Sequence, residues 1–340
     1  MTALGAAAVG PRSVESSSRP GLRSFEGYAI TCVLAALEMA GLLEALEGAG
    51  LRPPPRGEGG GEAGRLLEAS LRYLVQRQLA FEDSGAFKLT ESGRALTRDK
   101  GYLVWLAGGY GEPLRRLDAF LLGRKSYARD YPRDGRWVAE GAAMLGRRDV
   151  APQAMTLLKG ISFETALDLG CGNARFLIAV CQTFGCRGVG IDLSPEACQA
   201  ASESVRAAGM EERIRIIQGD AFDPAVSSHL GRAQLVITFF LLHELSSRGG
   251  SALVDFLSSL CSALPPGAHL LAAEVLPPRS RSGRPERFTP EFSLVHALMG
   301  QTLSGETEWR QAFRQGGFLV RDVTRVTMPG GVLLLGQRAA

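Results

Sequence analysis

From Thr165 onward, short apolar segments alternate with amphipathic ones, and this alternation restricts the possible fold more than any other feature of the chain. Apolar runs of strand length separated by helix-length patterns are typical of parallel strands joined by crossover helices. We therefore predict an α/β fold with a doubly wound, mostly parallel sheet. The expected strands are residues 166–169, 188–191, 214–217, 235–239, 269–275, 319–325 and 331–335, and the expected helices are residues 174–183, 196–208, 252–263 and 307–315.

The N-terminal part of the chain has a different pattern. Residues 1–24 are rich in Ser, Gly, Pro and Arg and predict a flexible lead, and a second stretch of low order runs from Pro53 to Gly61. Between these two stretches, residues 25–46 predict one long helix that is apolar on too many sides for a lone surface element. We expect this helix to pack against a second copy of the chain, in a homodimer.

A helix at residues 65–79 and two short strands at residues 80–82 and 86–89 resemble a winged helix. The expected recognition helix carries only three basic residues, so we predict a role in dimerisation rather than in binding DNA. The predicted organisation is a flexible N-terminus (1–24), a winged-helix-like dimerisation domain (25–100), a helical connector that lines the substrate pocket (101–160) and a catalytic domain (161–340).

Composition excludes several classes of protein. The 340 residues are 45% hydrophobic and 21% charged, which is typical of a soluble globular chain, and the apolar segment at residues 30–46 is interrupted by Glu38 and Glu44. A net charge of +3 does not indicate nucleic-acid binding, and we expect no membrane partner. The six cysteines form no CxxC pair and the N-terminus lacks the basic residues of a secretory signal, so we predict a cytoplasmic protein.

A glycine-containing turn follows the first expected strand, in the segment from Leu167 to Asn173. Gly170 and Gly172 let the backbone approach a ligand, and Asp192 ends the next strand, where a carboxylate can accept both hydroxyls of a ribose. Arg175 stands where a dinucleotide-binding turn has its third glycine, and the acidic Asp168 lies inside the strand end. The pattern therefore favours a nucleoside cofactor other than a dinucleotide.

These motifs resemble those of the class I S-adenosylmethionine (SAM) methyltransferases. Residues 218–221 resemble the motif that contacts the adenine, residues 235–240 resemble the strand that leads to the reaction centre, and Ala174 replaces the third glycine of the family's DxGxGxG motif. The resemblance implies SAM as the cofactor. The cofactor-binding residues that it implies are Asp168, Gly170, Gly172, Asp192, Leu193, Asp220, Ala221 and Phe239.

His243 follows the fourth strand of the expected sheet, at the edge where the transferred methyl group must emerge. In the small-molecule O-methyltransferases that this chain resembles, a histidine at this place, usually followed by Asp-Trp, removes the proton of the substrate hydroxyl. Here Glu244-Leu245 follows instead. The segment at residues 292–300 resembles the 2-oxo-acid C-methyltransferases of the phenylpyruvate type, which implies that His243 and His296 together hold a metal ion.

Two imidazoles and a carboxylate form a suitable site for a metal that also accepts substrate oxygens, and Glu244 is the expected carboxylate, as a third ligand or as a group that orients a histidine. Iron or zinc is expected, without a choice between them. The alternative is a metal-free site in which His243 is a base and His296 is a core residue.

The same resemblance extends to the substrate pocket. Trp105 matches a tryptophan on the pocket helix, and Arg133 matches an arginine that grips the substrate carboxylate, for which a guanidinium is well suited. Tyr110 replaces a small polar residue, and Phe240 completes the expected substrate-binding set.

These observations predict methylation of C3 of a 2-oxo acid through a metal-stabilised enolate, to supply a β-methyl amino acid for antibiotic biosynthesis. The expected catalytic residues are His243, Glu244 and Arg133, and the base is a metal-bound hydroxide, His243 or Glu244. The alternative function is that of a metal-free O-methyltransferase with His243 as the general base. A third reading is a protein that binds SAM without turnover.

Overall fold

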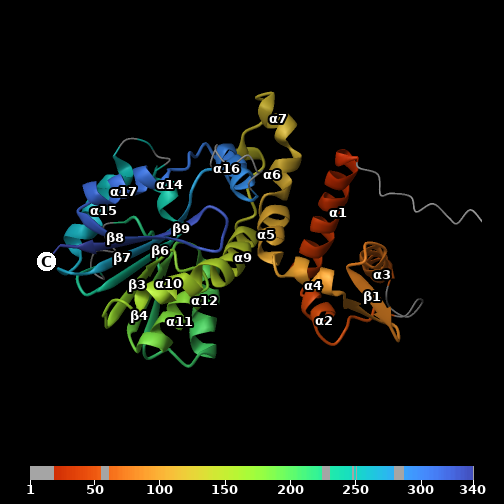
Figure 1. The fold of residues 1–340 in the computed structure, drawn as a ribbon, viewed down its shortest axis with the longest axis horizontal. Helices are drawn as coiled ribbons and strands as arrows, with labels where there is room; N and C mark the ends of the chain where they lie inside the picture. The colour runs from red at the N-terminus through yellow and green to blue at the C-terminus, as the bar shows by residue number, and fades with distance from the viewer. Residues whose placement is uncertain are drawn as a thin grey trace, which may run out of the picture. The chain divides into compact units, whose positions relative to one another are not determined.

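The computed structural model describes residues 19–54, 61–223, 230–246, 249, 251–278 and 287–339. The chain divides into two compact units, Met1–Thr97 and Arg98–Ala340 (Figure 1). Most of the expected lead (residues 1–18) and most of the expected low-order stretch (residues 55–60) lie outside the described residues. None of the helices in these ranges has the length and hydropathy that a membrane span requires.

The long helix predicted at residues 25–46 is in fact two helices, α1 (Pro20–Met39) and α2 (Leu43–Glu47). Gly41 adopts a φ of +70° between them, a conformation that favours glycine and ends a helix. The predicted start of the helix at residue 25 was also wrong, because residues 20–24 belong to α1 rather than to a flexible N-terminal segment. Pro20 lies in the first turn of α1, where its fixed φ suits a helix start and its missing N–H has no helical partner to lose.

The rest of the first unit contains α3 (Gly61–Gln76), β1 (Ala80–Asp83), β2 (Ala86–Leu89) and α4 (Glu91–Thr97). The predicted hairpin is confirmed, since β1 and β2 pair in antiparallel fashion. Ser84 and Gly85 both have positive φ angles, of 50° and 75°, as a tight two-residue hairpin turn requires.

The second unit begins with short helices that are followed by one long one. Gly141 on this long helix faces the backbone of Trp105 so closely that an added Cβ would lie 2.7 Å from it, so the two segments pack backbone against backbone. The elements are α5 (Lys100–Leu103), the π-helical η1 (Val104–Gly109), α6 (Gly111–Arg115), α7 (Leu117–Leu121), α8 (Tyr127–Asp130), α9 (Gly135–Leu145), the π-helical η2 (Gly146–Val150) and α10 (Ala151–Leu158).

A seven-stranded sheet follows, in the order β5-β4-β3-β6-β7-β9-β8. The pairs from β5 to β7 are parallel, and β9 is antiparallel to both of its neighbours, which confirms the predicted doubly wound, mostly parallel sheet. The strands are β3 (Thr165–Leu169), β4 (Arg187–Asp192), β5 (Ile214–Gln218), β6 (Leu235–Phe239), β7 (His269–Val275), β8 (Phe318–Arg325) and β9 (Gly331–Arg338).

Helices cover both faces of this sheet (Figure 1). Side chains alternate across a strand, so Leu235 and Ile237 of β6 join one hydrophobic core and Val236 joins the other. The first core includes residues of α10, α11 and α12, and the second includes residues of α15 and α17. The remaining helices of the unit are α11 (Arg175–Phe184), α12 (Pro195–Ala207), α14 (Leu242–Ser246), α15 (Ala252–Ala263), α16 (Thr289–Leu298) and α17 (Glu306–Gln315).

The N-terminus of α9 provides a test of this description. The Asp134 carboxylate accepts hydrogen bonds from the backbone N–H groups of Arg136 (3.0 Å) and Trp137 (3.2 Å). We expect Asp134→Ala to lower the free energy of unfolding by about 1 kcal/mol, because it removes this helix cap. All three tryptophans lie in the second unit, so urea denaturation followed by tryptophan fluorescence reports on it. Asp134→Asn, which keeps a capping oxygen, should lose much less, and equal losses in the two variants would contradict the capping role.

Candidate functional site

The turn after β3 has the backbone conformation that its glycines were expected to allow. Gly170 and Gly172 have φ angles of 75° and 55°, and the N–H of Gly170 donates to the Ile191 carbonyl (2.8 Å). Ala174, which stands at the third glycine position of the resembled motif, also adopts a left-handed φ of 56° as the N-cap of α11. Such a conformation costs an L-residue about 1 kcal/mol. The turn therefore keeps its shape even without the third glycine.

Asp192 at the end of β4 is held in place by this turn. One oxygen of its carboxylate accepts from the Gly172 N–H (2.9 Å) and the other from the Ser194 N–H (3.0 Å). Each carboxylate oxygen can accept a further hydrogen bond, so the group is oriented while it keeps acceptor capacity for a diol. The neighbouring Leu193 is largely exposed, which leaves its side chain available to a ligand.

Asp168 lies beneath the turn and is only 5% exposed. Burial, together with the charge of Asp192, raises the pKa of the Asp168 carboxyl from its ordinary 3.8 to about 7. A cationic group of a ligand in the turn would favour the ionised form and would itself be stabilised by it. SAM carries both an ammonium and a sulfonium, so the chemistry of this position fits the cofactor predicted from the sequence.

The remaining predicted cofactor residues lie at the carboxyl ends of neighbouring strands. Asp192 of β4 is paired with Gln218 of β5, and Asp220 and Ala221 follow two and three residues later. Asp220 is exposed and Ala221 is buried. Phe239, which ends β6, packs its ring against Phe176 of α11, with 4.6 Å between the ring centroids. The sheet thus brings these side chains to one edge.

His243 is buried on α14 and is anchored by Glu274 of β7, a residue that the sequence analysis did not single out. The Glu274 carboxylate is 1% exposed, contacts His243 Nδ1 at 2.8 Å and accepts from the Leu242 N–H at 2.9 Å. Burial acts to lower the pKa of His243, but the charge and hydrogen bond of Glu274 outweigh it, and the pKa is raised. The signal available in the sequence was a lone acidic residue inside the apolar strand at residues 269–275, since a buried carboxylate needs partners.

His296 lies beside His243, on α16. The centroids of the two rings are 5.0 Å apart and their planes cross at 75°. The Nδ1 atom of His296 lies 2.7 Å from the Phe292 carbonyl oxygen. Burial and the neighbouring His243 lower the pKa of His296 to about 3, which keeps its imidazole neutral near pH 7. The structure therefore brings together the two histidines that the sequence analysis paired.

Glu244, in contrast, is not assembled with the histidines into a three-residue ligand set. Its carboxylate oxygen Oε1 lies 3.7 Å from Nη2 of Arg133, because the guanidinium offers it an opposite charge. Throughout the described residues, no group of three or more His, Cys, Asp or Glu side chains is placed to hold a metal ion. The two histidines remain candidate donors, and a role of Glu244 as a third ligand or as a group that orients a histidine stays a prediction.

Three packed aromatic side chains lie next to Arg133, and we call them the aromatic wall: Trp105, Tyr110 and Phe292. Trp105 is buried and stacks on Phe292 with an interplanar angle of 14° and 5.5 Å between ring centroids, and Tyr110 packs against Trp105 at 4.8 Å. Nη1 of Arg133 donates to the Tyr110 hydroxyl (3.3 Å). Three of the predicted substrate residues are therefore gathered around α16, and the sequence analysis missed the contribution of Phe292. Phe240, the fourth, follows β6 with a positive φ of 56° and donates its N–H to the Ala273 carbonyl (2.8 Å).

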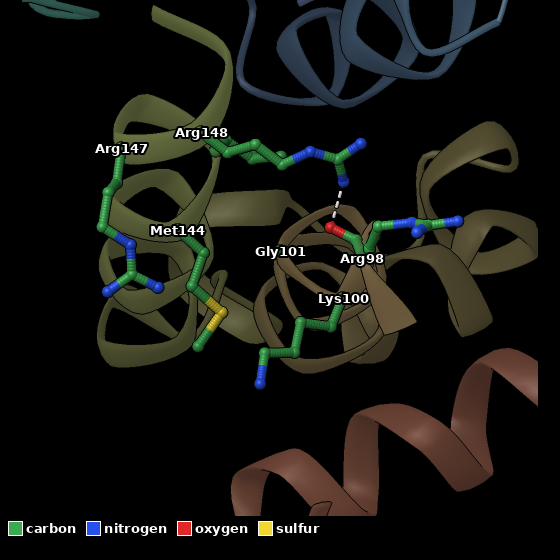
Figure 2. Close-up of a pocket in the computed structure, with 7 residues that line it drawn as sticks. Arg98, Lys100, Gly101, Met144, Arg147 and Arg148 are labelled. Atoms are coloured by element: carbon green, nitrogen blue, oxygen red, sulfur yellow. Dashed lines mark hydrogen bonds between the residues drawn. The ribbon is translucent and has the colours of Figure 1, made fainter. Parts of the chain in front are cut away.

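A small cavity elsewhere in the second unit contains none of the predicted site residues. It is lined by basic side chains, among them Arg98, Lys100, Arg147 and Arg148 (Figure 2). Arg148 donates to the Arg98 carbonyl and pairs with Asp99 at 2.6 Å. In Figure 2 the charged ends of these side chains do not converge on one point, so the cavity does not form a focused anion site.

Comparison with known proteins gives the same interpretation of the fold. Residues 166–267 match a protein family described as a methyltransferase domain. The 2-ketoarginine methyltransferase of Streptomyces arginensis is 29% identical over 314 residues, which cover 89% of each chain. The indolepyruvate C-methyltransferase of Streptomyces griseus is 29% identical over 270 residues, which cover 77% of this chain and 78% of that one.

Solved structures extend the similarity to almost the whole chain. An O-methyltransferase family protein from Burkholderia thailandensis has a TM-score of 0.66 at 17% identity, covering 96% of this chain and 99% of its own. Mitomycin 7-O-methyltransferase has a TM-score of 0.68 at 18% identity, covering 94% and 97%. These likenesses establish the class I methyltransferase fold. The family match over residues 166–267 and the two relatives support a SAM-dependent methyltransferase activity.

The buried Asp168 predicts a specific pH dependence. In the unfolded chain its carboxyl ionises near its ordinary pKa of 3.8, whereas in the folded protein it keeps its proton until about pH 7. Unfolding therefore releases a proton within this interval, and the free energy of unfolding falls as the pH rises through it. We expect the cofactor-free Asp168→Asn variant to gain stability relative to the wild type as the pH rises from about 4 to about 7, as measured by thermal unfolding. A difference that does not change with pH would contradict the buried, protonated carboxyl.

The contact between Glu274 and His243 predicts a change in the pKa of His243 when Glu274 is replaced. In metal-free protein, Glu274→Gln removes the charge that raises the pKa of His243, so this pKa should fall below its wild-type value. NMR of protein labelled at its four histidines can follow the change. His269, at the other end of β7, is an internal control whose titration should stay in place. An unchanged His243 titration would show that Glu274 does not control its charge.

Proposed function

We propose that this enzyme transfers a methyl group from SAM to C3 of a 2-oxo acid. The observation that carries the proposal is the buried pair of His243 and His296, 5.0 Å apart, close to an arginine that can bind a carboxylate. The names of the two curated relatives support it, because 2-ketoarginine and indolepyruvate are both 2-oxo acids. Both also cover more than three quarters of this chain.

Arg133 would bind the substrate carboxylate, and the aromatic wall would receive its side chain. The guanidinium is oriented by the Tyr110 hydroxyl at 3.3 Å and by Met299 Sδ at 3.4 Å. Trp105 and Phe292 offer stacked apolar surface beside it. A carboxylate held at one end and an apolar group at the other would fix C3 between them, and such alignment accounts for much of the rate of a single displacement.

The two histidines fit a divalent or ferric metal ion such as iron or zinc. The Nδ1 atom of each ring contacts an oxygen, from Glu274 in one case and from the Phe292 carbonyl in the other. Hydrogen bonds of this kind orient metal-binding imidazoles and direct Nε2 towards the ion. The pair fits a metal that completes its coordination with substrate oxygens, rather than one enclosed by three protein side chains. When bound, the ion would supply Lewis-acid polarisation of the keto group.

The reaction breaks the C3–H bond, sends its proton to a base and forms the C3–CH3 bond as the sulfonium S–CH3 bond breaks. The products are S-adenosylhomocysteine and a 3-methyl-2-oxo acid. We propose His243 and Glu244 as the proton acceptors, because Glu244 pairs with Arg133 and His243 lies within the electrostatic reach of both. An imidazole that binds a metal cannot also take the proton, so Glu244 would be the base if His243 held the ion.

Methyl transfer to a panel of 2-oxo acids and phenols, with and without chelator, tests this function. We expect turnover of a 2-oxo acid that chelator abolishes and added metal restores. His296→Ala should lose at least about 100-fold in activity together with its bound metal, because half of the protein's donor set is gone. His269→Ala, which removes a histidine outside the site, is the matched control. Retention of full activity in chelator would contradict the proposed requirement for a metal ion.

A second function is supported by the contact between His243 and Glu274 at 2.8 Å. A histidine oriented by a buried carboxylate is well suited to remove the proton of a phenol, so a metal-free O-methyltransferase is the alternative. This enzyme would methylate a phenol in the presence of chelator and would tolerate the loss of His296. The same panel of substrates therefore separates the two functions.

We also infer a homodimer, formed through α1. Its side chains Leu22, Phe25 and Tyr28 are 49%, 70% and 60% exposed, an apolar surface that a second copy would cover. All six cysteines are free thiols, which fits a reducing compartment such as the cytoplasm. A 3-methyl-2-oxo acid would be a precursor of a β-methyl amino acid, in keeping with a role in antibiotic biosynthesis.

A further inference from the structure

The guanidinium of Arg133 is already in contact with other groups at both terminal nitrogens. Nη1 lies 3.3 Å from the Tyr110 hydroxyl and 3.4 Å from Met299 Sδ. Nη2 lies 3.7 Å from the Glu244 carboxylate. Among the described residues, Glu244 is the only carboxylate that pairs with Arg133. A carboxylate is gripped best when it reaches two N–H groups of the guanidinium at once. Glu244 therefore stands where an incoming carboxylate would meet Nη2.

Glu244 has both the chemistry of a substrate carboxylate and room to move. Two carboxylates beside one guanidinium repel each other, so binding of one favours withdrawal of the other. The side chains of Arg133 and Glu244 are each 34% exposed, so the Glu244 carboxylate is partly hydrated and can rotate away from the guanidinium. The contact at 3.7 Å is a partly solvated ion pair, and such pairs are weak enough for a ligand to replace.

We propose that Glu244 is an internal competitor for the substrate carboxylate: it occupies Arg133 in the empty site and is displaced by the substrate. This inference rests on the proposed binding of a 2-oxo acid at Arg133. It makes Glu244 a specificity-determining residue, because only a ligand that brings its own anion gains from the displacement. A neutral analogue of the same shape leaves the pair intact and binds without this exchange.

Calorimetric titration of phenylpyruvate and of its methyl ester, in the presence of S-adenosylhomocysteine, tests the inference without turnover. Glu244→Gln should bind the acid about two- to fivefold more tightly than the wild type, since it removes an ion pair of ordinary surface strength. Binding of the ester should stay the same. The matched control is Glu306→Gln on α17, whose side chain is 33% exposed and pairs with Arg310 and Arg325. It should leave both affinities unchanged.

The possible outcomes distinguish a failure of this inference from a failure of the proposed function. Equal or weaker binding of the acid by Glu244→Gln, or an equal gain for acid and ester, overturns the competitor role while the 2-oxo acid function stands. If the wild type binds neither phenylpyruvate nor any 2-oxo acid of the activity panel, the proposed function fails and the inference fails with it. Thermal unfolding of both variants shows whether a change in affinity reflects a damaged fold.

Discussion

The parallel hydrogen-bonding register of β5, β4, β3 and β6 is the constraint on which the site depends. Because these strands run in one direction, the chain leaves each of them at the same edge of the sheet. Residues separated by more than 70 positions, such as Asp168 and Phe239, are thereby brought to one edge. Hydrophobic cores on both faces hold the register in place, since a slip by one residue would exchange the two faces.

Burial of charge at this edge gives the site its chemistry. Asp168 and Glu274 are 5% and 1% exposed, and they have different neighbours. Asp168 has the anionic Asp192 as its charged neighbour, so its pKa rises to about 7. Glu274 has an imidazole and two backbone N–H groups as partners, and it determines the orientation of His243. One carboxyl thus lies beneath the glycine turn, and the other holds His243 in place.

Arg133 lies where distant segments of the second unit meet. It lies just before α9, whose cap Asp134 fixes the start of the helix, and it reaches both Tyr110 and Glu244. Its partners come from three separate parts of the second unit. We propose this arginine as the ligand of a substrate carboxylate, and its place in the fold, not its place in the sequence, brings it to Glu244.

The sequence by itself determined the sheet, its helices and the glycine turn. The segments predicted at residues 252–263 and 269–275 coincide with α15 and β7, because the periodicity of apolar residues is a local property. Gly41 was also a local signal, although the prediction of one helix passed over it. Only the tertiary structure decided that Glu274 supports His243 and that Glu244 faces Arg133. These pairs are 31 and 111 residues apart, and which charges meet depends on how the strands and helices pack, not on the residues beside them in the chain.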